Sequence, residues 1–201
     1  MNIEMDNNKA YLQGVVDNTP EYNHTVKDED FYSFNLRVAR LSGQTDILPI
    51  IVPKKFVEMY DIKENMKLGV HGQFRSHNKI DDDKRKLILA VFAKEIVEWD
   101  DEANTNVVEL CGYICKPSIY RITPFSREIC DVLLAVNRNY NKSDYVPCIA
   151  WGANAQYVSR LTVATPLKIL GRIQSREYNK VIGDEVVTKT AYEVSISKII
   201  D

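Results

Sequence analysis

The sequence predicts an all-β protein with short helices, arranged as two tandem five-stranded barrels. Two observations lead to this fold class. The first is a repeat, because the first half of the 201-residue chain recurs in the second half at a shift of 98 residues. The second is that each copy consists of short apolar–polar alternations separated by glycine and asparagine, a pattern typical of strands and turns.

Identical residues at a fixed shift establish the repeat. Between residues 12 and 51, nine of forty positions match the residue found 98 positions later, where ordinary composition gives roughly two or three. The pairs are Leu12/Leu110, Gly14/Gly112, Tyr22/Tyr120, Leu36/Leu134, Val38/Val136, Arg40/Arg138, Asp46/Asp144, Pro49/Pro147 and Ile51/Ile149. After a one-residue slip the series continues with Leu68/Leu167, Gly72/Gly171 and Ser76/Ser175. The chain is therefore a tandem duplication of one folding unit.

The elements of each copy follow the same order. Apolar and polar side chains alternate over residues 34–38 and again over 132–136, which predicts strands. Besides strands we expect short helices at 54–60 and 154–161, and long charged hairpin loops at 79–86 and 179–189. About five strands and one short helix in each copy are the inventory of the OB-fold, a five-stranded Greek-key barrel.

A domain division follows from the repeat. We expect a degenerate OB-fold domain at 1–99, a linker at 100–106, where the chain is polar, and a second OB-fold domain at 107–201. Residues 1–103 carry 14 Lys and Arg against 19 Asp and Glu, a net charge of −5. Residues 104–201 carry 12 against 9, a net charge of +3. A polyanion is therefore expected on the second half.

Composition narrows the class of protein. The apolar fraction of 45% and charged fraction of 27% are those of a globular protein, and no apolar run is long enough to span a membrane. The first residues have neither a basic nor an apolar region, so we expect a cytoplasmic protein with reduced thiols. The four cysteines show no CxxC spacing, so we expect them to be small buried residues on strands and expect no metal. No catalytic motif is present, so neither an enzyme nor a cofactor is predicted.

With these patterns in view, the second repeat resembles the bacterial single-stranded DNA-binding proteins. The resemblance covers most of residues 107–200 and consists of four pieces in the right order and spacing. The pieces are the segment 110–114 with Pro117 and residues 121–124, the strand 134–138, Trp151-Gly152 with Ala155, and the strand 171–178. The first repeat departs from this pattern, because Ile47, Pro53 and Lys79 occupy the positions of Tyr145, Trp151 and Tyr178.

The resemblance and the residues together define a candidate binding face. Strand alternation places Tyr145, Pro147, Ile149 and Trp151 on one side, where exposed rings can stack on bases of any sequence. Arginines and a lysine nearby are expected to neutralise phosphates. The candidate nucleic-acid-binding residues are Arg121, Arg138, Tyr145, Trp151, Arg172, Arg176, Tyr178 and Lys180. Five alternatives stay open: Trp151 in a core, Tyr145 at an interface, Ile149 as a subunit contact, Tyr178 as a cover for the barrel, and Arg138 in a structural role like that of Arg40.

The predicted function is sequence-tolerant binding of single-stranded DNA in replication, repair or recombination, mainly by the second OB-fold. The resemblance also implies a homodimer, because two chains would present four OB-folds, the number that a tetramer of this family uses. The family's acidic C-terminal tail, which recruits partner proteins, is not expected, because residues 195–201 have the pattern of a last strand. The primosomal restart protein, an OB-fold relative without such a tail, stays possible. The alternative function is a primosome or phage-replication adaptor that uses OB-folds to dock other proteins.

Overall fold

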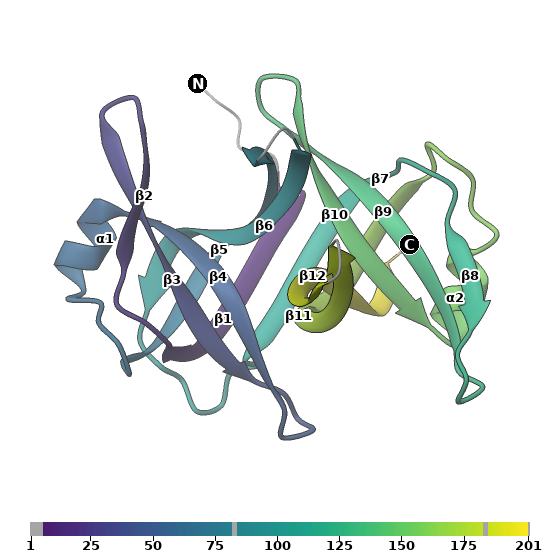
Figure 1. Cartoon of the computed structure of the whole chain (residues 1–201), viewed down its shortest axis with the longest axis horizontal. Helices are drawn as coiled ribbons and strands as arrows, with labels where there is room; N and C mark the ends of the chain where they lie inside the picture. The colour runs from purple at the N-terminus through teal and green to yellow at the C-terminus, as the bar shows by residue number, and fades with distance from the viewer. Residues whose placement is uncertain (1–5, 82–83, 183–184, 201) are drawn as a thin grey trace.

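Twelve strands and two short helices form the described part of the chain in the computed structural model (Figure 1). The structure describes residues 6–81, 84–182 and 185–200, with side chains throughout except at 78–81, 84–86, 180, 182 and 185. The first half contains β1 (Asn8–Val16), β2 (Glu21–Val26), β3 (Glu29–Ala39), β4 (Thr45–Pro53), α1 (Lys54–Met59), β5 (Lys67–Asp81) and β6 (Lys84–Val97). The second half repeats this order with β7 (Asn106–Ile114), β8 (Ile119–Ile122), β9 (Glu128–Arg138), β10 (Lys142–Trp151), α2 (Ala153–Val158), β11 (Pro166–Ile182) and β12 (Glu185–Ile200).

Each half closes into a barrel because the end of its first strand has partners on both edges. β1 pairs with β5 from Ala10 to Val15, and its end at Val15 and Val16 also pairs with β3. β3 continues to β4, β4 pairs in parallel with β6, and β6 pairs with β5. A Cβ atom at Gly14 would collide with the backbone carbonyl of Arg37, and one at Gly112 would collide with that of Ala135. Glycine is therefore required where the first strand of each copy bends from one partner to the next.

The predicted alternation is the interior of these barrels. In the first barrel Phe34, Leu36 and Val38 are all buried, and in the second barrel Leu134 and Val136 are buried. Full burial of one such side chain contributes about 1.5–3 kcal/mol. The all-β class with short helices and the two OB-fold barrels are thereby confirmed. Within the described ranges, no helix has the length and apolar character needed to cross a bilayer.

A two-fold symmetric ladder joins the barrels. β1 and β7 pair antiparallel, with Asn8 opposite Leu110 and Leu12 opposite Asn106. Because the repeat equates residue 8 with 106 and 12 with 110, each pair is the symmetry mate of the other, as in an isologous dimer interface. The ladder makes one continuous sheet of both halves (Figure 1). The division into 1–99, 100–106 and 107–201 stays a prediction.

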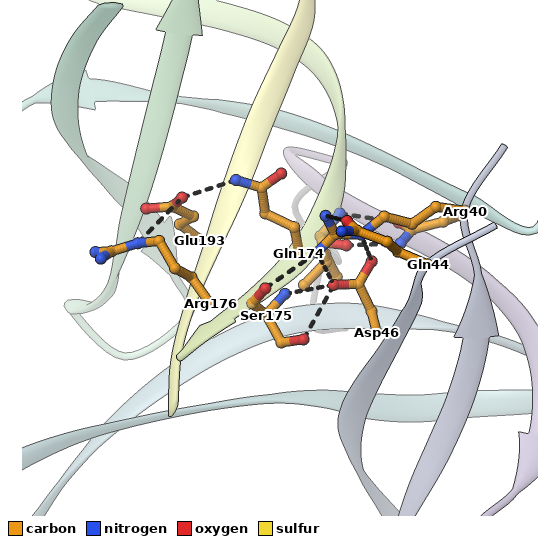
Figure 2. A network of polar contacts seen from close by, with 9 residues as sticks. Arg40, Gln44, Asp46, Gln174, Ser175, Arg176 and Glu193 are labelled. Carbon is orange, nitrogen blue, oxygen red and sulfur yellow. Dashed lines mark hydrogen bonds and ion pairs between the residues drawn. The ribbon is translucent and has the colours of Figure 1, made fainter. Parts of the chain in front are cut away.

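A buried carboxylate reinforces this junction on one side. Asp46, at the start of β4 and fully buried, accepts hydrogen bonds from the backbone N–H of Ser175 (2.7 Å) and from its hydroxyl (3.0 Å). Arg40 donates to the same carboxylate from Nε (2.7 Å) and, from Nη2, to the carbonyl of Ser175 (3.0 Å). Figure 2 shows this cluster linking the first barrel to β11. Burial alone raises the pKa of Asp46, but hydrogen bonds from Arg40 and Ser175 outweigh it and hold the pKa below its usual value.

The symmetry-related cluster is built from the equivalent residues and is less complete. Asp144, fully buried on β10, accepts a hydrogen bond from the backbone N–H of Ser76 (2.7 Å), and the Ser76 hydroxyl accepts one from the N–H of Tyr145 (2.7 Å). Arg138 Nε lies 3.3 Å from Asp144 Oδ2, but neither atom has a hydrogen-bond partner. Burial raises the pKa of Asp144 above its usual value despite Ser76 and Arg138. The repeated residues Arg40, Asp46 and Ser76 therefore mark the junction, which sequence analysis did not assign.

Three expectations need correction. The described residues of the segments 79–86 and 179–189 are strands and not loops, because β5 runs to Asp81, β6 begins at Lys84, β11 runs to Ile182 and β12 begins at Glu185. These long strands form two-stranded ribbons whose register continues to their tips. Burial holds for Cys130 and Cys148, but Cys111 is exposed and Cys115 is half-buried. Cys111 points outward because its neighbours Leu110 and Gly112 face the interior of the curved β7 strand.

Asn substitutions at the two buried aspartates are expected to have unequal effects. Asp46→Asn leaves Arg40 without its carboxylate, so we expect it to lower the free energy of unfolding by about 3–5 kcal/mol at neutral pH. Asp144→Asn keeps an acceptor for Ser76 and removes a poorly satisfied charge, so it is expected to cost markedly less. Urea denaturation of both variants and the wild type measures the difference.

The same variants test the pKa shifts by their pH dependence. The pKa of folded Asp46 lies below its unfolded value, so its stabilisation is present above that value and is lost as pH falls through the folded pKa. The pKa of folded Asp144 lies above its unfolded value, so the folded state gains stability as pH falls through the folded pKa. On acidification the deficit of Asp46→Asn relative to wild type should shrink and that of Asp144→Asn should grow. Parallel changes in both variants would contradict this assignment.

Candidate nucleic-acid interface

The outer face of β9 and β10 carries the two predicted stacking rings. Tyr145 is 43% exposed and Trp151 is 38% exposed, and strand alternation places both on the same face. They are six residues apart on β10, which corresponds to about 20 Å along a strand. Trp151 is therefore not a core residue. Pro147 is half-buried between the rings, whereas Ile149 is only 6% exposed and does not offer the subunit contact that its outward parity indicated.

A glycine determines how the chain leaves this face. Gly152 follows Trp151 with φ of +53° and ψ of −124°, a conformation that residues with a side chain rarely adopt. Its N–H donates to the carbonyl of Glu128 (3.0 Å), which holds the end of β10 against β9. α2 begins at the next residue, Ala153. The Trp-Gly pair thus places the indole at the last position of the strand.

β11 contributes cations and a third ring. Alternation places Arg172, Gln174, Arg176 and Tyr178 on one side of the strand. The Arg176 guanidinium lies 5.9 Å from the ring centroid of Tyr178, and its Nε lies 4.0 Å from a carboxylate oxygen of Glu193. Gln174 donates to that oxygen at 2.7 Å (Figure 2). The Arg176 side chain is 59% exposed, so such a distant ion pair leaves it able to meet a phosphate.

Two of the remaining candidates, Arg172 and Arg138, have other surroundings than the Arg176–Tyr178 pair. Arg172 is half-buried and lines a crevice of about 450 Å³ at the junction, beside Arg40 and Leu41. Arg138 lies over the buried Asp144. The side chain of Lys180 lies outside the described residues.

Arg121 reaches the β9 surface but is occupied by an acid. Its Nη2 and Nε donate to Asp131 Oδ2 at 2.8 and 3.0 Å. Asp131 stands opposite Ile149, on the same outward parity as the rings. Sequence analysis missed this carboxylate, although its alternation with buried Cys130 and Val132 is the signal that places it on the surface. The ion pair makes this part of the face electrically neutral.

The equivalent face of the first barrel is hollowed and differently composed. A groove of about 730 Å³ lies between β2, β3, β4 and the β5–β6 ribbon. Its described lining residues are Asn18, Glu21, Asn23, His24, Ser33, Phe34, Asn35, Pro49, Ile51, His77, Ile88, Ala90 and Phe92, and none is Lys or Arg. His24 stacks on Phe31 with ring centroids 5.0 Å apart. The first barrel therefore has rings of its own, at positions that the repeat does not predict.

Two barrels of this strand order define a tandem OB-fold protein. Residues 105–200 match the Single-strand binding protein family. Over 96 residues the chain is 30% identical to Single-stranded DNA-binding protein 3 of Streptococcus agalactiae serotype V, covering 44% of this chain and 70% of that protein. It is 33% identical over 96 residues to Single-stranded DNA-binding protein 1 of Streptococcus pyogenes serotype M18, covering 44% of this chain and 74% of that protein. The chain belongs to the single-strand binding protein family.

A solved structure extends the likeness to both barrels. The wild-type single-stranded DNA binding protein from Thermus aquaticus superposes with a TM-score of 0.74 at 20% identity, covering 96% of this chain and 91% of that one. The two proteins therefore share the whole two-barrel fold. Some relatives are longer than the matched region, since it covers 59% of Single-stranded DNA-binding protein 1 of Streptococcus agalactiae serotype III. Family membership agrees with the expectation that the chain is not an enzyme.

Gly152→Ala tests the placement of Trp151. A Cβ at this position has no atom within 4 Å, so the expected loss of about 1–3 kcal/mol in unfolding free energy comes from backbone strain alone. In a Trp99→Phe background, the emission of Trp151 should shift because the strand end moves. Gly43→Ala is the matched control, since Gly43 also has positive φ and an open Cβ position but lies in the β3–β4 turn. An unchanged Trp151 spectrum in Gly152→Ala would contradict the role given to the glycine.

Proposed function

We propose that this chain binds single-stranded DNA with little sequence preference, mainly through its second barrel. The observation that carries the proposal is the pair of exposed rings, Tyr145 and Trp151, on one strand face of a barrel that belongs to this family. Its relatives are named single-stranded DNA-binding proteins, which supports this ligand. Each ring that stacks on a base contributes about 1–3 kcal/mol and accepts any base.

Phosphate contacts complete the mechanism. Arg176 stands beside Tyr178, so a strand stacked on that ring would bring a phosphate to the guanidinium. Each neutralised phosphate releases counterions, and binding should therefore weaken as salt increases. Lys180, Arg172, Arg138 and Arg121 stay candidates for further contacts. We assign most of the DNA binding to the proposed second domain, 107–201, because the second half of the chain is net basic and the first half is net acidic.

The wider setting is part of the same proposal. We expect the protein to act in DNA replication, repair or recombination in the cytoplasm. We expect two chains to associate, which brings four OB-folds together. Sedimentation equilibrium tests the assembly, because a homodimer has the mass of two chains and a monomer that persists at high concentration would exclude it.

Trp151→Ala is expected to weaken binding of oligo-dT by about 1–3 kcal/mol, or roughly 5–150-fold in Kd, because one stacking platform is lost. Fluorescence anisotropy of labelled oligo-dT at low salt measures the change without relying on tryptophan emission. Tyr157→Ala is the matched control, since Tyr157 is 46% exposed on α2 and not on the strand face. The proposal would be contradicted if the wild type did not bind at low salt, or if wild type and Trp151→Ala bound with equal affinity.

A second candidate function, docking of a protein partner, is favoured by the groove on the first barrel. Its described lining contains two histidines and one Glu but neither Lys nor Arg, which suits a protein surface better than a phosphate backbone. Asn35→Lys places a charge in this groove. The adaptor function predicts a partner that wild type captures after nuclease treatment and Asn35→Lys does not, with oligo-dT affinity unchanged in the variant. Capture that the variant retains would exclude the groove as the docking site.

A further inference from the structure

The duplicated arginines of the junction have diverged in their bonding. Arg40 is satisfied, because it donates to Asp46, to the Ser175 carbonyl and to Gln44 Oε1 (3.1 Å). Arg138 occupies the equivalent position, yet its Nε is buried without a hydrogen-bond partner and its side chain is 29% exposed. Arg40 is therefore fully engaged at the junction, whereas the Arg138 side chain lies over Asp144 and stays partly exposed.

Arg138 lines a pocket of about 540 Å³ between the barrels. The first barrel contributes the tip of the β2–β3 hairpin, and the second contributes the tip of β9–β10; both hairpins rise on the same side of the molecule (Figure 1). The cations among its lining residues are Lys27, Arg75, Arg138 and Lys142, and no Asp or Glu is among the described residues that line it. The pocket thus collects positive charge from both halves, although the first half is net negative.

The positions of the two lysines make them suited to an anion. Lys142 stands opposite Arg138 in the β9–β10 ladder, where paired side chains start about 5 Å apart. Lys27 lies at the β2–β3 turn with φ of +48°, which directs the chain back sharply and presents the side chain at the hairpin tip. Both lysines are exposed, and no ion pair among the described residues involves either one. The buried Asp144 beneath Arg138 offsets one of the four positive charges.

The pocket lies near one end of the proposed binding face, on the other side of β10. Lys142 begins β10 three residues before Tyr145, about 10 Å along the strand, and alternation points its side chain to the opposite face from that ring. Tyr140, in the β9–β10 turn, lines the pocket and is 75% exposed, which offers a ring beside the cations. A phosphodiester chain that leaves the ring face at Tyr145 and passes round the β9–β10 turn therefore meets positive charge before it reaches the first barrel.

We propose that this inter-barrel pocket binds a phosphate of single-stranded nucleic acid as one strand passes from the second barrel to the first, with Lys27, Arg138 and Lys142 as its ligands. Cationic side chains and Arg in particular suit the tetrahedral anion, because they supply several charge-assisted donors. The inference rests on the proposed function and adds a path to it. The pocket matters only for strands long enough to leave the second barrel.

The full-length Lys27→Ala/Lys142→Ala double variant tests this path with oligo-dT of two lengths. One OB-fold occupies about 4–16 nucleotides, so we choose oligomers of about 8 and about 30 nucleotides. For the long oligomer the slope of log K against log salt should decrease in magnitude by up to about 0.7, since the two lysines share one phosphate and each phosphate contact on a single strand contributes about 0.7. The affinity and slope for the short oligomer should equal those of the wild type. Lys54→Ala/Lys63→Ala is the matched control, because it removes the same charge from exposed lysines outside the pocket.

The outcomes distinguish failure of the pocket from failure of the proposed single-stranded DNA binding. Wild type that binds neither oligomer overturns the proposed function. Wild type that binds both, with a double variant that weakens both oligomers equally or neither, overturns only the pocket. Calorimetric titration with inorganic phosphate distinguishes a free-phosphate site: phosphate binding that the double variant abolishes, with unchanged affinity for the long oligomer, also overturns the strand path. Loss specific to the long oligomer, absent in the control variant, supports it.

Discussion

The antiparallel ladder between β1 and β7 is the constraint on which the rest of the structure depends. Its register relates the two copies by a two-fold axis, so whatever one barrel offers to the other is offered in return. Asp46 therefore meets Ser175 just as Asp144 meets Ser76. Arg176 directly follows Ser175 on β11, and Tyr145 directly follows Asp144 on β10. The junction therefore also positions the candidate binding strands.

The duplicated unit kept its framework and diverged at its surfaces. Identities between the copies fall on buried residues such as Leu36 and Leu134, and on the aspartates and serines of the junction. Apart from the exposed pair Tyr22 and Tyr120, the rings discussed on the outer faces differ between the copies, because a surface substitution seldom disturbs the packing beneath it. The result is one face with exposed rings and arginines and another with a groove whose described lining has no cationic Lys or Arg. Two-fold architecture thus supports an asymmetric molecule.

Part of the candidate site could be predicted because strand alternation is a local property. The outward position of Tyr145 and Trp151 follows from their parity with buried Val146 and Ala150. Parity fails for Ile149, which is buried by its surroundings in three dimensions, whereas the exposed Cys111 follows parity and contradicts only the expectation from residue type. It also cannot show that Asp131 holds Arg121 or that Asp144 lies under Arg138, because those partners are ten and six residues apart along the chain.

Residue patterns along the chain were enough to predict a duplicated β-barrel protein, many of its interior positions, and the exposed rings of the second copy. These properties depend on residue identity, periodicity and repeat spacing, which are all properties of the linear sequence. Only the tertiary structure decided that the repeated Arg, Asp and Ser residues form the junction and that Arg40 is satisfied while Arg138 is not. It also decided that lysines from two hairpins meet at one pocket. Such contacts join residues over 60 positions apart, and no local pattern reports which distant partner the closed barrels bring near.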